Sequence, residues 1–175
     1  MFHLHARPKN RLESIHTSTP SLEVEKLKSV MYGLAIGDAL GVPYEFQQRD
    51  TFNCTGMIGH GEHNQPAGTW SDDTALSLAT LDSLTECHGE VNTADMLMRY
   101  RMWLELGMYM PDGNTFDSGI TVATAIRSRH GCDGLNDNGN GSLMRVAPCA
   151  FYNLPDMEIK QVSAITHAHE ISRSE

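Results

Sequence analysis

Two adjacent carboxylates between two hydroxyls form the densest group of chemically useful side chains in this sequence. They are Ser71, Asp72, Asp73 and Thr74, directly after Gly68, Thr69 and Trp70. Small divalent cations such as Mg²⁺ prefer hard oxygen ligands of this kind, with waters and substrate oxygens completing the shell. The pattern also fits the start of a helix, because Ser71 can be an N-cap and acidic residues in a first turn favourably oppose the helix dipole. These four residues alone leave both interpretations open, and capping is the commoner of the two.

Another carboxylate lies on a helix face that should be buried. From residue 22 onward, apolar side chains recur at three- and four-residue spacing, which predicts an amphipathic helix that ends before Pro43. Asp38 falls on that stripe, and a buried carboxylate has to be paired, hydrogen-bonded or directed at a metal, because its desolvation is costly. Asp38 is therefore a site candidate. Gly33, Gly37 and Gly41 leave one side of the same helix smooth, and close packing of another helix is the ordinary explanation.

Helical periodicity also dominates the rest of the chain. A mostly apolar helix with few charged positions before Asp82 is predicted over residues 71–87, and a third helix follows with Asn92 and Asp95 as its cap. Two more helices are predicted, one over residues 116–130 and one after Pro155. No segment has the alternating pattern of a strand, and no internal repeat is present. The sequence therefore predicts an all-α fold.

Two glycine-containing loops separate these helices. Residues 47–69 contain four glycines and a proline, and long loops in compact domains are often functional. Residues 131–141 are almost all Gly, Asn and Asp, and they lead into a predicted helix. The end of this second loop could direct backbone amides at an anion with a helix dipole behind them, although an ordinary polar turn is the simpler explanation.

Composition narrows the classes of partner. The 175 residues are 40% hydrophobic, enough for one domain with a core, and the net charge of -9 arises from 22 acidic residues against 13 Lys plus Arg. Without a basic stripe to follow a phosphate backbone, nucleic acid is not an expected partner. The chain has neither the apolar core of a signal peptide nor a run of about 18 apolar residues, so we expect no membrane contact and a cytoplasmic location.

The cysteines and histidines show no metal-binding pattern. The four cysteines lack a paired CxxC spacing, so reduced thiols are expected in place of a zinc site or disulfides. They are Cys54, Cys87, Cys132 and Cys149. His3 and His5 lie in an expected flexible tail, and His60 and His63 lie in the first glycine-containing loop. Because there is no helical HExxH arrangement, neither pair is expected to bind a metal.

Five segments, taken together and in order, resemble the ADP-ribosylglycohydrolase family, including its dinitrogenase reductase-activating members. They are Gly33–Glu45, Gly68–Thr74, Gly113–Gly119, Asn138–Arg145 and Thr166–His169. The resemblance extends from about residue 27 to the end of the chain. It predicts a flexible N-terminal tail over residues 1–21 and a partial family domain over residues 22–175.

This resemblance implies an all-α orthogonal helical bundle that holds two Mg²⁺ ions. It also implies a hydrolase that removes ADP-ribose from a protein side chain or a related small molecule. The residues that match the family's first-half metal ligands are Ser71, Asp72 and Asp73. Glu45 matches a loop glutamate near the scissile bond, and Asp117 lies where a carboxylate would face the leaving group. Two metals would clamp the ribose hydroxyls while a carboxylate handles the proton.

A substrate-binding set is implied as well, for the diphosphate and the ribose beside it. Its members are Asn138, Gly139, Asn140, Gly141 and Ser142, with Met144 and Arg145 behind them and His167 reaching in from the last helix. The motifs do not encode whether the modified residue is arginine, serine or a small-molecule ester, because that depends on details of the pocket.

Members of this family normally continue well beyond the Thr-His segment, and their second half supplies an Asp-x-Asp-Thr set that completes the two-metal site. This sequence stops at Glu175 and contains no substitute set. We therefore expect impaired hydrolysis, and exposed apolar surface that favours self-association. An interrupted gene product, a deliberately shortened chain and completion by another subunit are the explanations left open.

Two other functions compete with hydrolysis. A non-catalytic module would bind ADP-ribose or a nucleotide with an affinity that survives chelation of Mg²⁺. A structural role, as in the lens crystallins that share this fold, would place no demand on a clustered carboxylate set. The intact Ser71, Asp72 and Asp73 cluster therefore favours hydrolysis over a structural role.

Overall fold

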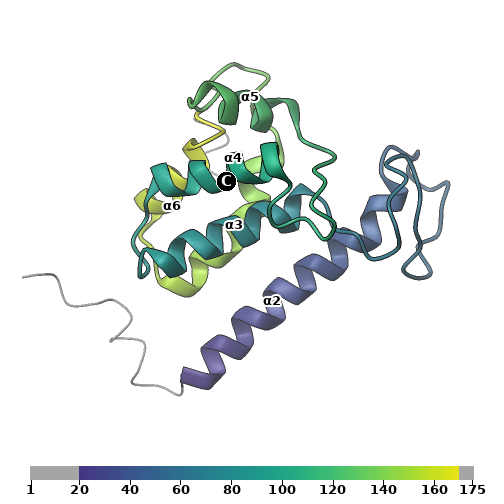
Figure 1. Cartoon of the computed structure of the whole chain (residues 1–175), viewed down its shortest axis with the longest axis horizontal. Coiled ribbons are helices and arrows are strands. Elements are labelled where there is room, and N and C mark those ends of the chain that lie inside the picture. The colour runs from purple at the N-terminus through teal and green to yellow at the C-terminus, as the bar shows by residue number, and fades with distance from the viewer. Residues whose placement is uncertain (1–19, 170–175) are drawn as a thin grey trace, which may run out of the picture.

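Helices alone make up the regular structure of residues 20–169, the part of the chain that the computed structural model describes (Figure 1). The α-helices are α2 (Pro20–Gly41), α3 (Asp72–Glu86), α4 (Thr93–Leu106), α5 (Ile120–Ser128) and α6 (Asp156–Ala164). The 3₁₀ helices are η2 (Val42–Tyr44), η3 (Asn140–Arg145) and η4 (Ala147–Tyr152). The predicted all-α class is confirmed. Of the expected tail over residues 1–21, all but Pro20 and Ser21 lie outside the described residues, and those two begin α2.

Four of the other elements pack against α3. This helix contacts α2, α4, η3 and η4, and Figure 1 shows it between α2 and α4. Its sequence explains the position, because residues 74–81 carry no charge. The apolar side chains that it buries completely are Ala75, Leu76, Ala79 and Leu84. One of its buried hydroxyls links it to a neighbouring element: Ser77 Oγ donates to the Met144 carbonyl at 2.8 Å, which ties α3 to η3.

α4 begins and ends as its sequence predicts. The Asn92 side chain accepts a hydrogen bond from the Asp95 amide at 3.1 Å, so the predicted cap is confirmed. The helix ends at Gly107, which adopts a left-handed φ of 66°. Arg99 pairs with Asp95 at 2.7 Å and also with Asp82 of α3. The pair with Asp82 holds α4 against α3, and the pair with Asp95 lies within α4.

The helix predicted over residues 116–130 begins later than expected. α5 starts at Ile120, and Asp117 precedes it with a left-handed φ of 49°. Thr115 Oγ1 donates to the Trp103 carbonyl of α4, which holds the incoming chain against α4. Asp117 is therefore a loop residue and not part of a first helical turn.

The helix expected after residue 141 is replaced by two short 3₁₀ helices, η3 and η4. The Arg145 guanidinium donates to the Gly141 carbonyl, which is the acceptor that the residue 145 amide would use in an α-helix. Pro148 then has no N–H to continue an α-helix. Asn140–Ser142 thus lie inside a 3₁₀ helix, and the predicted support from an α-helix dipole is absent.

One side of α2 is uncovered within the described residues. Its exposed apolar side chains are Val24, Val30, Tyr32 and Ile36. A Cβ placed at Gly33, Gly37 or Gly41 would have no atom within 4 Å, so the close helix packing expected there is not formed by residues 20–169. Self-association through this apolar surface stays a prediction. Over the same residues, no helix has both the length and the apolar character needed to cross a membrane.

Candidate active site

A carboxylate from α2 holds the turn that begins α3. Asp38 Oδ1 accepts the Ser71 hydroxyl at 2.7 Å, and Asp38 Oδ2 accepts the Thr74 hydroxyl at 2.6 Å and the Thr74 amide at 3.0 Å. The Ser71 amide donates to both oxygens at 3.0 Å. Ser71 thus occupies the N-cap position, but Asp38 accepts the amide that an N-cap side chain normally takes. Of the three environments predicted for Asp38, hydrogen bonding is the one observed.

Asp72 and Asp73 occupy the first turn of α3 and face a cleft. Burial, with the charges of Asp73 and Asp117 nearby, raises the pKa of Asp72 to about 8. Burial and the charges of Asp38 and Asp117 raise the pKa of Asp73 to about 6. The ionised forms of these carboxylates are therefore unfavourable in the cleft unless a cation neutralises them.

The donor atoms in this turn fit a hard divalent cation. Two carboxylates from consecutive residues face the cleft, and the Ser71 hydroxyl oxygen adjoins them. Because Ser71 Oγ gives its proton to Asp38, its lone pairs are available to a cation. An all-oxygen set with two carboxylates is the kind that Mg²⁺ accepts.

The cleft has a volume of about 620 Å³ and brings together most of the predicted site residues. Those that line it are Asp72, Asp73, Asp117, Gly139, Asn140, Gly141, Met144 and His167. Its other lining residues are Gly119, which ends the Gly113–Gly119 segment, and four residues outside the five segments, Ile120, Thr121, Asn136 and Asp137. Those predicted but not lining it are Ser71, Glu45, Asn138, Ser142 and Arg145.

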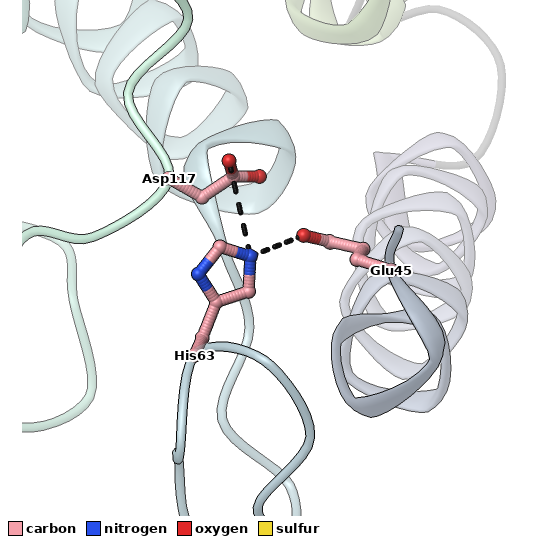
Figure 2. Close-up of side chains that lie close together, drawn as sticks. All are labelled: Glu45, His63 and Asp117. Carbon is pink, nitrogen blue, oxygen red and sulfur yellow. Dashed lines mark hydrogen bonds and ion pairs between the residues drawn. The ribbon is translucent and has the colours of Figure 1, made fainter. Parts of the chain in front are cut away.

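Glu45 joins the cleft through a histidine that the sequence did not indicate. Figure 2 shows the His63 ring between the Glu45 and Asp117 carboxylates. His63 Nε2 lies 2.6 Å from Glu45 Oε2 and 3.9 Å from Asp117 Oδ1. Burial, opposed by the bond to His63 and supported by the charge of Asp117, raises the pKa of Glu45. From the sequence, His63 was expected only not to bind a metal, and the structure adds its contact with a predicted catalytic carboxylate.

The far wall of the cleft is formed by the glycine loop and His167. The His167 ring packs against Gly141, and its Nδ1 hydrogen-bonds Thr166 Oγ1 at 2.8 Å. Burial and the charge of Arg145 lower the pKa of His167 to about 4, so its imidazole is neutral near pH 7. His167 therefore presents a neutral ring to the cleft.

Arg145 supports this loop from behind and does not reach the cleft. Its side chain is completely buried, and its guanidinium donates to the Gly141 carbonyl and to the Val162 and Ser163 carbonyls at 3.2 Å. It also lies over the Tyr100 ring at 5.1 Å from the centroid. Arg145 thus lies behind the loop with its Nη donors directed at backbone carbonyls, while its Nε has no hydrogen-bond partner among the described residues. Its part in substrate binding stays a prediction.

We expect Gly141→Ala to lower the free energy of unfolding by about 1–3 kcal/mol, the usual cost of overpacking. An added Cβ would lie 2.7 Å from Val122 Cγ2 and 2.8 Å from His167 Cε1. Gly139→Ala is the matched control, because a Cβ there would lie 4.0 Å from its nearest neighbour, His167 Nε2. Urea unfolding of both variants tests this, and equal stabilities would contradict the tight contact at Gly141.

Comparison with known proteins shows the family to which this chain belongs. The family model for ADP-ribosylglycohydrolase matches residues 18–174. The chain belongs to the ADP-ribosylglycohydrolase family. The resemblance read from the five sequence segments is thereby confirmed.

Individual relatives in the family are similar along most of this chain. ADP-ribosylarginine hydrolase Tri1 of Pseudomonas putida (strain GB-1) is 31% identical over 159 residues, which cover 87% of this chain and 43% of the relative. ADP-ribosyl-[dinitrogen reductase] glycohydrolase of Rhodospirillum rubrum is 32% identical over 150 residues, 80% of this chain and 50% of the relative. The chain thus spans about half the length of these relatives or slightly less.

A solved structure shares both the fold and part of the sequence. The ADP-ribosylglycohydrolase-related protein complex aligns with a TM-score of 0.66 and 29% identity, over 82% of this chain and 50% of that one. The helical arrangement of this chain is therefore shared with about half of that solved chain.

Proposed function

We propose that this chain supplies the metal-binding and substrate-binding wall of a Mg²⁺-dependent hydrolase that removes ADP-ribose from a modified protein side chain. The observation that carries the proposal is the cleft in which Asp72, Asp73 and Asp117 face the backbone of Gly139 and Gly141. Two relatives are named ADP-ribosylarginine hydrolases, which supports modified arginine as the substrate class.

The proposed metal ligands are Ser71, Asp72 and Asp73, which present only oxygen atoms. When bound, Mg²⁺ would hold the ribose hydroxyls and polarise the anomeric centre or a water beside it. Asp38 would keep the ligands in place, because its hydrogen bonds to Ser71 and Thr74 set the backbone of the turn. A negative cleft of this kind would also need the cation before it could accept a diphosphate.

Proton transfer would be the task of the two remaining carboxylates. Asp117 lines the cleft and would either exchange a proton with the reacting groups or bind the guanidinium of an arginine substrate through paired hydrogen bonds. Glu45 would act beside it from the end of η2, where His63 holds its carboxylate at 2.6 Å. The long loop that carries His63 would allow this side of the cleft to open and close.

Binding of the diphosphate would be the task of the glycine loop. Gly139 and Gly141 have no side chains, so a ligand can approach their backbone closely. The neutral His167 ring stands behind that backbone and would accept or donate a hydrogen bond without repelling a cation. Asn140 and Met144 complete this wall of the cleft.

Calorimetric titration of the purified chain with ADP-ribose, with Mg²⁺ and again with chelator, tests the proposal. We expect binding that requires Mg²⁺ and that Asp72→Asn weakens at least about tenfold, a loss typical of even an indirect metal partner. The matched control is Asp50→Asn, which alters an exposed aspartate outside the cleft. We expect binding more than turnover, because the described residues supply one ligand set where two-metal chemistry needs two.

Two outcomes would count against the proposal in different ways. Binding that is equally strong in chelator would favour the non-catalytic ADP-ribose-binding module. An absence of binding in both conditions would overturn the substrate assignment for this chain.

A further inference from the structure

Three side chains from three separate segments converge on one point beside the cleft (Figure 2). They are Glu45 after η2, His63 in the loop of residues 47–69, and Asp117 before α5. One potential ligand atom from each lies within 4.8 Å of the others. We propose that these residues bind a transition-metal ion such as Zn²⁺, using none of the Mg²⁺ ligands on α3.

The geometry centres on one ring nitrogen. His63 Nε2 makes the 2.6 Å contact with Glu45 Oε2 and the 3.9 Å contact with Asp117 Oδ1. Ligand atoms bonded to one tetrahedral Zn²⁺ at about 2.0–2.2 Å lie roughly 3.3 Å apart. The first contact would have to lengthen and the second to shorten, each by less than about 1 Å. The ion would replace the proton between Glu45 and His63, because a ligating imidazole is unprotonated at that nitrogen.

The surroundings suit such an ion. The side chains of His63, Glu45 and Asp117 are 14%, 28% and 31% exposed, so the point is half-buried and open to a water or a substrate atom as a further ligand. Among residues 20–169, no lysine or arginine forms an ion pair with either carboxylate. The Phe46 and Phe116 rings lie 5.7 Å and 5.1 Å from the His63 ring and limit its rotation.

The histidine sets the preference for a metal. Imidazole nitrogen favours Zn²⁺ and other transition ions, whereas Mg²⁺ is bound mainly by oxygen. The two sites therefore differ in chemistry, with an all-oxygen set at the start of α3 and a mixed nitrogen and oxygen set at His63. Excess Mg²⁺ should fill the first without displacing Zn²⁺ from the second.

Occupation of this site would inhibit hydrolysis, and this consequence rests on the proposed function. Glu45 and Asp117 are the carboxylates assigned to proton transfer, and a bound transition ion would hold both. Binding itself does not depend on that assignment. It can therefore be measured without ADP-ribose.

Equilibrium titration of the full chain with Zn²⁺, in excess Mg²⁺ and without an affinity tag, tests the proposal. Wild type is expected to gain a site that His63→Gln and Asp117→Asn each weaken at least about tenfold. His60→Gln is the matched control, because His60 lies in the same loop but bonds Asn64 at 2.9 Å and is not part of the cluster. In the wild-type chain, Co²⁺ should shift and broaden the NMR signals of the His63 ring, a result that requires no variant.

Equal Zn²⁺ affinity in wild type and His63→Gln would overturn the proposal, as would His63 ring signals that do not respond to Co²⁺. If Zn²⁺ binds as expected but ADP-ribose does not, the metal site stands and the proposed function fails. If ADP-ribose binds but Zn²⁺ does not, the proposed function stands and the metal site fails.

Discussion

Replacing Asp38 with asparagine is expected to lower the free energy of unfolding by about 3 kcal/mol, a large part of the total stability of a domain. Each carboxylate oxygen accepts at least one backbone N–H, from Ser71 at Oδ1 and from Ser71 and Thr74 at Oδ2. In either orientation of an asparagine side chain, its NH₂ group would therefore face a backbone N–H, and neither of these two donors could accept from the other. The turn that carries the proposed metal ligands would be displaced.

Urea unfolding measures the loss of stability in Asp38→Asn. Titration with Mn²⁺ measures the effect on the proposed metal ligands, because the electron paramagnetic resonance signal of the free ion disappears when the ion binds. Asp50→Asn is the control, since Asp50 is exposed and its left-handed φ of 65° is tolerated by asparagine. A variant of Asp38 as stable as that control would show that the hydrogen bonds to Ser71 and Thr74 contribute little.

Stability of the metal-free chain is expected to fall as the pH rises from about 4 to about 8. The pKa of Asp72 is about 8 in the folded chain, against about 3.9 in an unfolded one. Between these values the folded state holds a proton that the unfolded state has released, so stability is lost as the pH rises through the window. At about 1.36 kcal/mol per pH unit, the loss is on the order of 5 kcal/mol. Asp73, with a pKa of about 6, acts in the same direction over the lower part of the window.

Thermal unfolding in chelator across this pH range should show a Tm that falls by on the order of 10 °C. Mg²⁺ should restore most of the loss near pH 8, because it favours the ionised carboxylates. Asp72→Asn removes the titrating group and should flatten the profile. A profile in chelator that stays level, or that Mg²⁺ does not alter, would contradict the carboxylate cluster as a cation site.

The sequence was most informative where structure depends on near neighbours. The cap of α4 needs only Asn92 and Asp95, which are three residues apart, and it was predicted correctly. The uncharged residues 74–81, which explain why α3 lies in the core, can also be read directly from the sequence. Asp38 was identified as a candidate because helical periodicity placed it on the packed face of α2. These features follow from local chemistry, which a sequence contains in full.

The remaining features depend on contacts that span long segments. His63 lies 18 residues from Glu45 in a loop without periodicity, so only the path of the loop brings them together. Asp117 was expected in a helical turn, but α5 begins only at Ile120. The segment before it is held against α4 by the hydrogen bond from Thr115 Oγ1 to the Trp103 carbonyl. Arg145 has the chemistry of a phosphate ligand, and nothing in the motif indicates that its two Nη atoms would donate to backbone carbonyls.

The hydrogen bonds to Asp38 also lead us to expect an order of events in folding. They join residues that are 33 and 36 positions apart, whereas the helical bonds of α3 span only one turn. Closing a loop of that length costs roughly 3 kcal/mol of chain entropy, so the turn at Ser71 takes its final shape only when α2 docks against α3. A chain caught before that step would have a formed α3 and both aspartates, yet it would bind cations weakly. Affinity for the proposed cation would therefore be acquired late and would report the docking of α2 more faithfully than helix content does.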